Sequence, residues 1–397
     1  MRDGWQLKKL GEVCDTIQDG AHESPKLQFD SPGNGRFLYI TSKNIRNNHL
    51  DLENVTYVDE DFHNRIYPRC RPSVGDVLLT KDGANTGNVT LNTLDEPFSL
   101  LSSVCLIKTA PDSLLPSFLS YFIQSPDGLK SITGQMTGAG IKRIILRDIK
   151  LAEIPIPPLP EQQRIVALLD EAFAGLASAK ANAERNLQNA RALFESHLQS
   201  VFSQRGEGWV ETTLGEIGKV CMCKRIFKEE TTANGDIPFY KIGTFGKEPD
   251  AFIPIHIFNK YRTSHPFPKK GAVLVSASGT IGRRVRYDGE PAYFQDSNIV
   301  WIDNDEAHVL NNYLYHFYGA CAWNSTSGAT ISRLYNDNLR RISIRFPSSL
   351  HEQRWIVSRL DELAEETQRL TRLYERKLAA LEELKKSLLH QAFNGEL

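Results

Sequence analysis

Apolar residues recur at seven-residue intervals through residues 350–397, and this period predicts a long α-helix with one buried stripe. The two rows of this stripe are Ile356, Leu363, Leu370, Lys377, Leu384 and Leu360, Thr367, Tyr374, Leu381, Leu388. A second long helix is predicted over residues 159–204, where the corresponding rows are Ile165, Ala172, Ala179, Asn186, Leu193 and Leu169, Leu176, Ala183, Ala190, His197. Small side chains in one helix correspond to large ones in the other, so we expect the two helices to pack as an antiparallel coiled coil.

The expected packing positions are Ile165, Leu169, Leu176, Asn186, Leu193, Ile356, Leu360, Leu363, Leu370, Tyr374, Lys377, Leu381 and Leu384. The alternative is that each helix packs only on a neighbouring domain, but a helix of about 40 residues spans about 60 Å, more than one small domain covers. Asn186 and Lys377 interrupt their rows with polar side chains. Either they meet near the middle of the pair and specify its register, or Lys377 extends along the edge of the core to reach solvent.

The chain is internally duplicated. Residues 161–171 and 352–362 are identical at seven of eleven aligned positions, and the same ungapped alignment continues along both predicted helices. Residues 5–13 and 209–217 form a second repeated segment that marks the start of each copy. Internal repeats of this kind indicate a repeated structural unit. The expected domains are residues 1–158, a central spacer helix over 159–204, a second domain over 205–349 and a C-terminal spacer helix over 350–397.

The regions that precede the two long helices have the pattern of mixed strand and loop. Short β-branched and aromatic runs at residues 36–40 and 75–80 predict strands, each followed by a polar loop. Matching runs occur at residues 237–242 and 271–276. We therefore expect an α+β fold with two mixed α/β domains, separated by the two long helices and related by a pseudo-two-fold duplication.

Composition places the chain among ordinary globular proteins, with 41% hydrophobic and 24% charged residues. No apolar run has the length of a membrane span, the N-terminus lacks a signal-peptide core, and the six cysteines have no framework spacing. These features predict a cytoplasmic protein with reduced thiols and no membrane association. The pair Cys221 and Cys223 has no second pair to complete a zinc site.

The net charge of −1 argues against nucleic-acid binding by bulk basicity, but it permits local basic surfaces. Two such clusters precede the long helices, and they are Lys142, Arg143, Arg147, Lys150 and Arg333, Arg340, Arg341, Arg345. One cluster alone would suggest a solvated face. Their recurrence at equivalent places favours a functional surface.

The sequence contains no pattern that supports catalysis by this chain. It has no phosphate-binding Gly-x-x-x-x-Gly-Lys-Ser/Thr loop. His351-Glu352-Gln353-Arg354-Trp355 begins like a zinc-protease motif but has Trp355 in place of the second histidine. No Asn-Pro-Pro-Tyr-like tetrapeptide of an adenine methyltransferase is present. We therefore expect neither a catalytic residue nor a bound metal.

Four segments resemble the specificity subunits of Type I restriction-modification systems. These are the two Trp-x-x-x-x-Leu-Gly-Glu starts, the Gly75-Asp76-Val77-Leu78-Leu79 strand and the Pro-rich junction over residues 154–165. The C-terminal residues 388–397 are also typical of that family. The second junction departs from the pattern, since only Pro347 remains of the proline run.

The resemblance implies two target recognition domains that each read half of a split, asymmetric sequence in double-stranded DNA, held apart by the two helices. It also implies two modification subunits docked on the helices, and two restriction subunits joined to that core. S-adenosylmethionine, ATP and Mg would belong to these partner subunits, and none of them to this chain.

On this interpretation, Lys and Arg side chains contact phosphates while polar loop residues read base edges. The candidate DNA-binding residues are Thr41, Ser42, Lys43, Asn44, Arg46, Lys81, Asn85, Thr86, Lys142, Arg143, Lys241, Thr244, Lys247, Ser278, Thr280, Arg283, Arg284, Ser332, Arg333 and Arg340. Two other classes of protein remain open at this point. A stand-alone regulator would bind a split DNA site without partners, whereas an adapter for protein or glycan would have no salt-dependent affinity for DNA.

Overall fold

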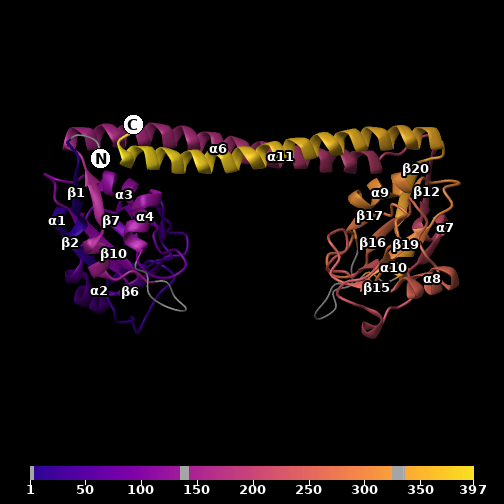
Figure 1. The fold of residues 1–397 in the computed structure, drawn as a ribbon, viewed down its shortest axis with the longest axis horizontal. Coiled ribbons are helices and arrows are strands. Elements are labelled where there is room, and N and C mark those ends of the chain that lie inside the picture. Colours follow the sequence, from indigo (N-terminus) through magenta and orange to yellow (C-terminus); the bar gives the residue numbers. More distant parts are fainter. Residues whose placement is uncertain (1–3, 135–142, 324–333, 335) are drawn as a thin grey trace. The chain divides into compact units, whose positions relative to one another are not determined.

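The computed structural model describes residues 4–134, 143–323, 334 and 336–397. The chain forms two compact units, unit 1 of residues 1–183 with 376–397 and unit 2 of residues 184–375. Each unit contains one globular head and a segment of each long helix (Figure 1). These helices are α6 (Leu159–Phe202) and α11 (Leu350–Asn394). We call the globular parts head 1 and head 2.

Head 1 is built on a four-stranded antiparallel sheet with the strand order β2-β10-β7-β8. Its strands are β2 (Cys14–Asp19), β10 (Val104–Thr109), β7 (Val77–Thr80) and β8 (Val89–Leu91). Alternate residues of a strand face opposite sides of its sheet. Accordingly, Val77 and Leu79 belong to one buried cluster and Leu78 to another. The apolar sequence of β7 is therefore buried on both faces.

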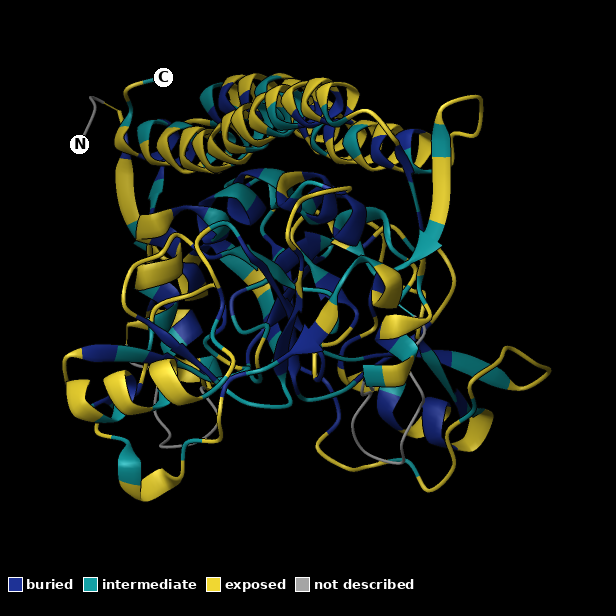
Figure 2. Cartoon of the chain, turned by 90° about the vertical axis from the view of Figure 1, so that its right-hand side faces the viewer, coloured by how far each residue is buried: buried dark blue, intermediate teal, exposed yellow. Residues whose placement is uncertain are grey.

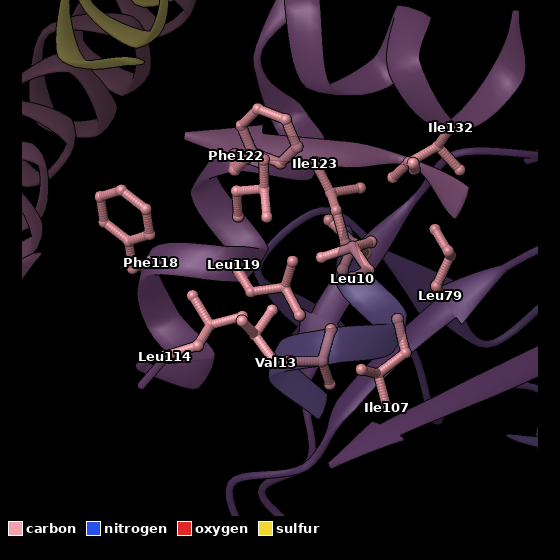
Figure 3. Close-up of a cluster of buried hydrophobic side chains, with 14 of the residues drawn as sticks. Leu10, Val13, Leu79, Ile107, Leu114, Phe118, Leu119, Phe122, Ile123 and Ile132 are labelled. Atoms are coloured by element: carbon pink, nitrogen blue, oxygen red, sulfur yellow. The ribbon is translucent and has the colours of Figure 1, made fainter. Parts of the chain in front are cut away.

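The buried cluster that contains Val77 and Leu79 joins head 1 to the long helices. Figure 3 shows Leu79 and Ile107 of the sheet in the same buried cluster as Phe118 and Phe122, which lie on α3 (Pro116–Gln124). Ile132 of α4 (Pro126–Thr133) belongs to the same cluster. The cluster continues into Ile165, Leu169, Leu389, Ala392 and Phe393 of the long helices. Head 1 and its two helix segments thus share one core.

The other face of the sheet packs against a smaller sheet with the order β6-β3-β9, in which β3 pairs antiparallel with β6 and parallel with β9. The strands of this smaller sheet are β6 (Thr56–Asp59), β3 (Arg36–Ile40) and β9 (Ser99–Leu100). The remaining elements of head 1 are β4 (Ile45–Arg46), β5 (His49–Leu50), α2 (Glu60–Ile66), η1 (Tyr67–Arg69), β1 (Gln6–Lys9), α1 (Leu10–Val13), α5 (Leu146–Leu151) and β11 (Glu153–Ile156). β1 pairs with β11, so the start of head 1 closes onto the strand that leads into α6.

Head 2 repeats three of the four sheets of head 1, and its described residues contain no counterpart of the β4-β5 pair. Its sheets have the orders β13-β19-β16-β17, β15-β14-β18 and β12-β20. The elements are β12 (Trp209–Thr213), α7 (Leu214–Ile217), β13 (Lys219–Cys221), η2 (Lys228–Glu230), β14 (Ile237–Tyr240), β15 (Phe252–Ile253), α8 (Ile255–Ser264), β16 (Val273–Ser276), β17 (Arg284–Arg286), β18 (Tyr293–Phe294), β19 (Ile299–Asp303), α9 (Asn311–Ala320), α10 (Asn336–Arg340) and β20 (Ser343–Pro347). The predicted α+β class and the duplication of the heads are confirmed.

Within each unit the two long helices run antiparallel. In unit 1, Arg164 donates to the carbonyl oxygen of Leu397 at 2.7 Å, and Lys180 pairs with Glu382 at 2.7 Å. In unit 2, Arg191 pairs with Glu375 at 3.0 Å. Figure 2 shows that exposed residues predominate along these helices, whereas buried residues concentrate in the sheets. The buried stripe on each helix is therefore narrow.

The residues that are buried on the two long helices differ in part from the predicted packing positions. Ile165, Leu169, Ile356 and Leu360 are buried, and Leu176, Leu363, Leu370, Tyr374 and Leu381 are half-buried. Asn186 and Lys377 are exposed, and so are Leu193 and Leu384, at 65% and 48%. A straight α-helix drifts by about 20° per heptad relative to a seven-residue repeat. The predicted row that contains Leu169 stays buried at Ala183 and Ala190, and beyond it the buried positions shift to Leu198 in α6 and to Leu389, Ala392 and Phe393 in α11. That Asn186 and Lys377 specify the register stays a prediction.

Candidate nucleic-acid interface

Each head is fixed to its helix by a buried glutamine of the repeated segment. Gln162 accepts a hydrogen bond from the backbone N–H of Leu115 and donates to the carbonyl oxygens of Ser113 and Pro157, all at 2.9 Å. Gln353 makes the same three bonds in unit 2, with Leu310, His308 and Pro347 at 2.8–2.9 Å. Both side chains are fully buried. The repeated glutamine therefore sets how each head meets the start of its helix.

A second link joins an equivalent aspartate on each helix to the head. The hydroxyl of Tyr121 donates to Asp170 in unit 1. In unit 2, Nε2 of His316 lies 2.8 Å from Asp361, and Arg286 pairs with the same carboxylate at 3.1 Å. Burial lowers the pKa of His316 despite the nearby Asp361. A neutral His316 donating to Asp361 fits this geometry.

The two loops predicted to bind DNA lie side by side in head 1. Asn85, in the loop after β7, donates to the carbonyl oxygen of Ser42 in the loop after β3, at 3.2 Å. The backbone N–H of Ser42 bonds to Oγ of Ser103 at 3.1 Å, which adds the turn after β9. Gly83 and Gly87 have φ values of +100° and +96°, which favour glycine. The glycines identified in the sequence thus shape this surface loop.

Head 2 brings together the equivalent loops. Arg283, after β16, donates to the carbonyl oxygen of Phe245 at 3.0 Å, in the loop that follows β14. Ser278 donates to Oδ1 of Asn298 at 2.7 Å, in the turn after β18. The two heads therefore carry the same three-loop surface, with different side chains.

The candidate residues differ in accessibility. Lys43, Arg143, Lys247, Thr280 and Arg340 are exposed. Thr41, Ser42, Arg46, Asn85, Thr86, Lys241, Thr244, Arg283 and Arg284 are partly exposed, and Asn44, Lys81 and Ser278 are buried. Lys142, Ser332 and Arg333 lie outside the described residues. The exposed lysines and arginines are the members best placed to meet a phosphate.

Several candidates have structural contacts that the sequence did not indicate. The amide of Asn44 bonds to the backbone of Thr41 and Asp51, so it shapes the loop. Arg284 lies over the ring of Tyr315 at 4.7 Å, and burial lowers the pKa of its guanidinium. Arg345, from the second basic cluster, is held by both carboxylate oxygens of Glu211 at 3.0 and 3.1 Å. These side chains are less available to a ligand than the sequence suggested.

Sequence reasoning missed a cluster of charges beneath the loops of head 1. Asp19 is buried and pairs with Arg69 at 2.7 Å, His22 at 3.1 Å and Lys81 at 3.4 Å. Burial alone would raise the pKa of Asp19, but the Arg69 hydrogen bond and Lys81 hold it below the usual value. Asp82 adds a second carboxylate, 3.7 Å from Nζ of Lys81. Lys81 was predicted to contact DNA, but in the structure its side chain is buried and pairs with Asp19 and Asp82.

Head 2 has its own unpredicted charges at the equivalent edge. Arg225 pairs with Asp296 at 3.0 Å, beside the turn that contains Asn298. Ser297, in that turn, has a φ of +60°, which is uncommon for a residue other than glycine. In the sequence, the adjacent basic residues Lys224 and Arg225 are the feature that could have indicated this charged site.

Within the described ranges, no three His, Cys, Asp or Glu side chains gather as a metal site. None of the helices that the structure describes has an apolar stretch suited to crossing a bilayer. All six cysteines are free thiols.

Comparison with known proteins identifies the family. The profile of the Type I restriction modification DNA specificity domain matches residues 2–185 and again residues 206–382. A Haemophilus influenzae protein assigned as a type I restriction enzyme specificity subunit is 48% identical over 239 residues, which are 59% of this chain and 62% of that protein's length. The StySPI specificity subunit of Salmonella potsdam is 22% identical over 428 aligned positions, covering all of this chain and 89% of that subunit.

Solved structures share the fold over the whole chain. A chain from a type I R-M system, in a study of complex assembly and conformational transition, has a TM-score of 0.81 at 20% identity, covering 100% of this chain and 99% of its own. The HsdS subunit of Thermoanaerobacter tengcongensis has a TM-score of 0.61 at 20% identity, covering 100% and 98%. At this identity the likeness concerns the fold. Because the specificity-domain profile matches both copies of the repeat, this chain belongs to the Type I restriction modification DNA specificity family.

Proposed function

We propose that this chain is the DNA-recognition subunit of a Type I restriction-modification complex and has no catalytic activity of its own. The observation that carries the proposal is the duplicated three-loop surface, built on the same strands in both heads but with different side chains. Each head reads one half of a split, asymmetric site in double-stranded DNA. Exposed lysines and arginines contact phosphates, and polar groups of the loops contact base edges.

The long helices hold the two heads and provide the surface on which partner subunits dock. Two modification subunits bring S-adenosylmethionine and carry out methyl transfer at the site that this chain selects. Two restriction subunits bring ATP and Mg for translocation and cleavage. Membership of the family supports this division of labour, in which the chain itself supplies recognition.

Exchange of one head tests the proposal. We expect that replacing residues 1–158 by those of a relative changes one half of the methylated sequence and leaves the other half unchanged. This cut keeps the pairing of β1 with β11 inside the exchanged segment. The measurement is sequencing of methylated DNA from cells that express the chimera with its modification subunits. The chain expressed without those subunits is the control, and it should methylate nothing.

If both halves changed together, the heads would not be separable readers. If the purified chain transferred methyl groups alone, the non-catalytic assignment would be wrong. Tight binding to a split site with no modification subunit would instead favour a stand-alone regulator. Absence of any salt-dependent DNA affinity would favour an adapter for another ligand.

The helices are expected to determine the gap between the two half-sites. Four residues inserted after both Asn186 and Lys377 add about 6 Å of rise to each helix. The preferred gap should then grow by one or two base pairs, at about 3.4 Å each, while both half-sequences stay the same. Selection of binding sites from a pool of duplexes with variable gaps measures this. A control replaces the exposed Gln188 and Asn189 by alanine without changing the length. Retention of the original gap by the insertion variant would contradict the prediction.

A further inference from the structure

Asp82 of head 1 is held rigidly at the base of the loop after β7. Its Oδ2 lies 3.3 Å from Nε of Arg143 and 3.7 Å from Nζ of Lys81. Lys81 is itself fixed, because its side chain is 5% exposed and pairs with Asp19 at 3.4 Å. The Asp82 side chain is 14% exposed. Two cations thus immobilise one oxygen of a carboxylate that still reaches the surface.

The second oxygen of Asp82 has no hydrogen-bond partner among the residues that the structure describes, so it is an acceptor available to a ligand. Arg143 is 57% exposed and pairs with Asp82 through Nε. Its terminal nitrogens can therefore meet a phosphate while Nε keeps the carboxylate in place. The positive charges of Arg143 and Lys81 offset the repulsion between Asp82 and the phosphates of DNA.

Head 2 lacks this charge at the same place in the fold. Thr80 pairs with Val104 on the central strand of head 1, and Ser276 pairs with Ile299 in head 2. Asp82 follows Thr80 by two residues, and Ser278 follows Ser276 by two residues. Ser278 therefore occupies the position of Asp82 in head 2. Ser278 donates to Oδ1 of Asn298 at 2.7 Å. The shared fold therefore forms this loop without a carboxylate, so the carboxylate of Asp82 is a property of head 1 alone.

We propose that Asp82 is a specificity-determining residue of head 1, whose free oxygen accepts a hydrogen bond from the exocyclic amino group of a cytosine or an adenine. The inference rests on the proposed DNA-recognition function. An ionised carboxylate only accepts hydrogen bonds. In the major groove, cytosine and adenine present amino donors, whereas guanine and thymine present carbonyl acceptors. Asp82 therefore selects bases that carry an amino group and disfavours the other two.

The test is the substitution Asp82→Asn in the full chain assembled with its modification subunits. Selection from a pool of duplexes randomised at every position of the site measures the base preference. We expect that one position of one half-site, limited to cytosine or adenine in the wild type, loses about tenfold of its discrimination against guanine and thymine. An amide has this effect because it can also donate to a carbonyl oxygen. The other half-site should not change.

Asp76→Asn is the matched control, because Asp76 is a carboxylate of the same head that pairs with Lys108 at 2.7 Å, at the opposite end of β7 from Asp82. It should keep every base preference. Asp82→Ser is the second variant, since serine occupies this place in head 2 and is compatible with the loop. It should relax the same position as Asp82→Asn.

The inference is overturned if both Asp82 variants keep the wild-type preference at every position. It is also overturned if they weaken binding equally for all sequences, because Asp82 would then act only through Arg143 on the phosphates. Failure of the wild-type complex to select any sequence would instead count against the proposed function. The two failures are thus distinguishable.

Discussion

Replacing Gln162 by alanine is expected to lower the free energy of unfolding of unit 1 by about 2–4 kcal/mol. The substitution removes the three hydrogen bonds of a fully buried amide and leaves Leu115 N–H and the carbonyl oxygens of Ser113 and Pro157 without that partner. A buried polar group left unpaired costs about 1–3 kcal/mol. Gln353→Ala should have the same effect on unit 2. Urea titration with hydrogen exchange of each unit measures the change.

Gln163→Ala is the matched control for this experiment, because Gln163 is the exposed neighbour of Gln162 on the same helix turn. It should change stability by less than about 0.5 kcal/mol. If Gln162→Ala unfolded at the same urea concentration as the control, the amide would not anchor the head. If Gln353→Ala destabilised unit 1 equally, the two anchors would not be independent.

Truncation of Phe393 to alanine is expected to cost about 3–5 kcal/mol. Phe393 is 4% exposed, and its ring centroid lies 5.0 Å from that of Phe118 and 5.3 Å from that of Phe122. Its loss leaves a cavity where α11 packs on head 1. We expect faster hydrogen exchange along residues 376–394 and earlier unfolding of unit 1.

Leu384→Ala is the control on the same helix, since Leu384 is 48% exposed. It should cost less than about 1 kcal/mol, because little apolar area is removed from the interior. Phe202→Ala tests the equivalent contact in unit 2, where its ring lies 5.1 Å from Tyr313 and 5.6 Å from Phe317. Equal stability of the Phe393 and Leu384 variants would show that the C-terminal part of α11 is not held by this contact.

Local patterns in the sequence were sufficient for the repeated parts of the fold. The repeated segment at residues 161 and 352 predicted two long helices, which begin at Leu159 and Leu350. Alternating and apolar runs predicted the buried strands β7 and β16, and polar, glycine-containing stretches predicted the loops that follow them. Helix and strand periods, turn residues and internal repeats all involve residues that are near in sequence or aligned by the repeat, so the sequence alone shows them.

Side-chain partners from distant parts of the chain were decided only by the tertiary structure. The heptad pattern placed Leu193 and Leu384 in the stripe, but the drift of a 3.6-residue helix turns them to solvent. Gln162 and Gln353 were visible as repeated residues, but not as anchors, because two of the three partners of each lie more than 40 residues away. The cluster of Asp19, Arg69 and Lys81 likewise joins three separate elements. The sequence by itself determined the duplication, the secondary structure and the family resemblance, whereas packing of remote segments determined which polar groups are used inside the fold and which remain free for a ligand.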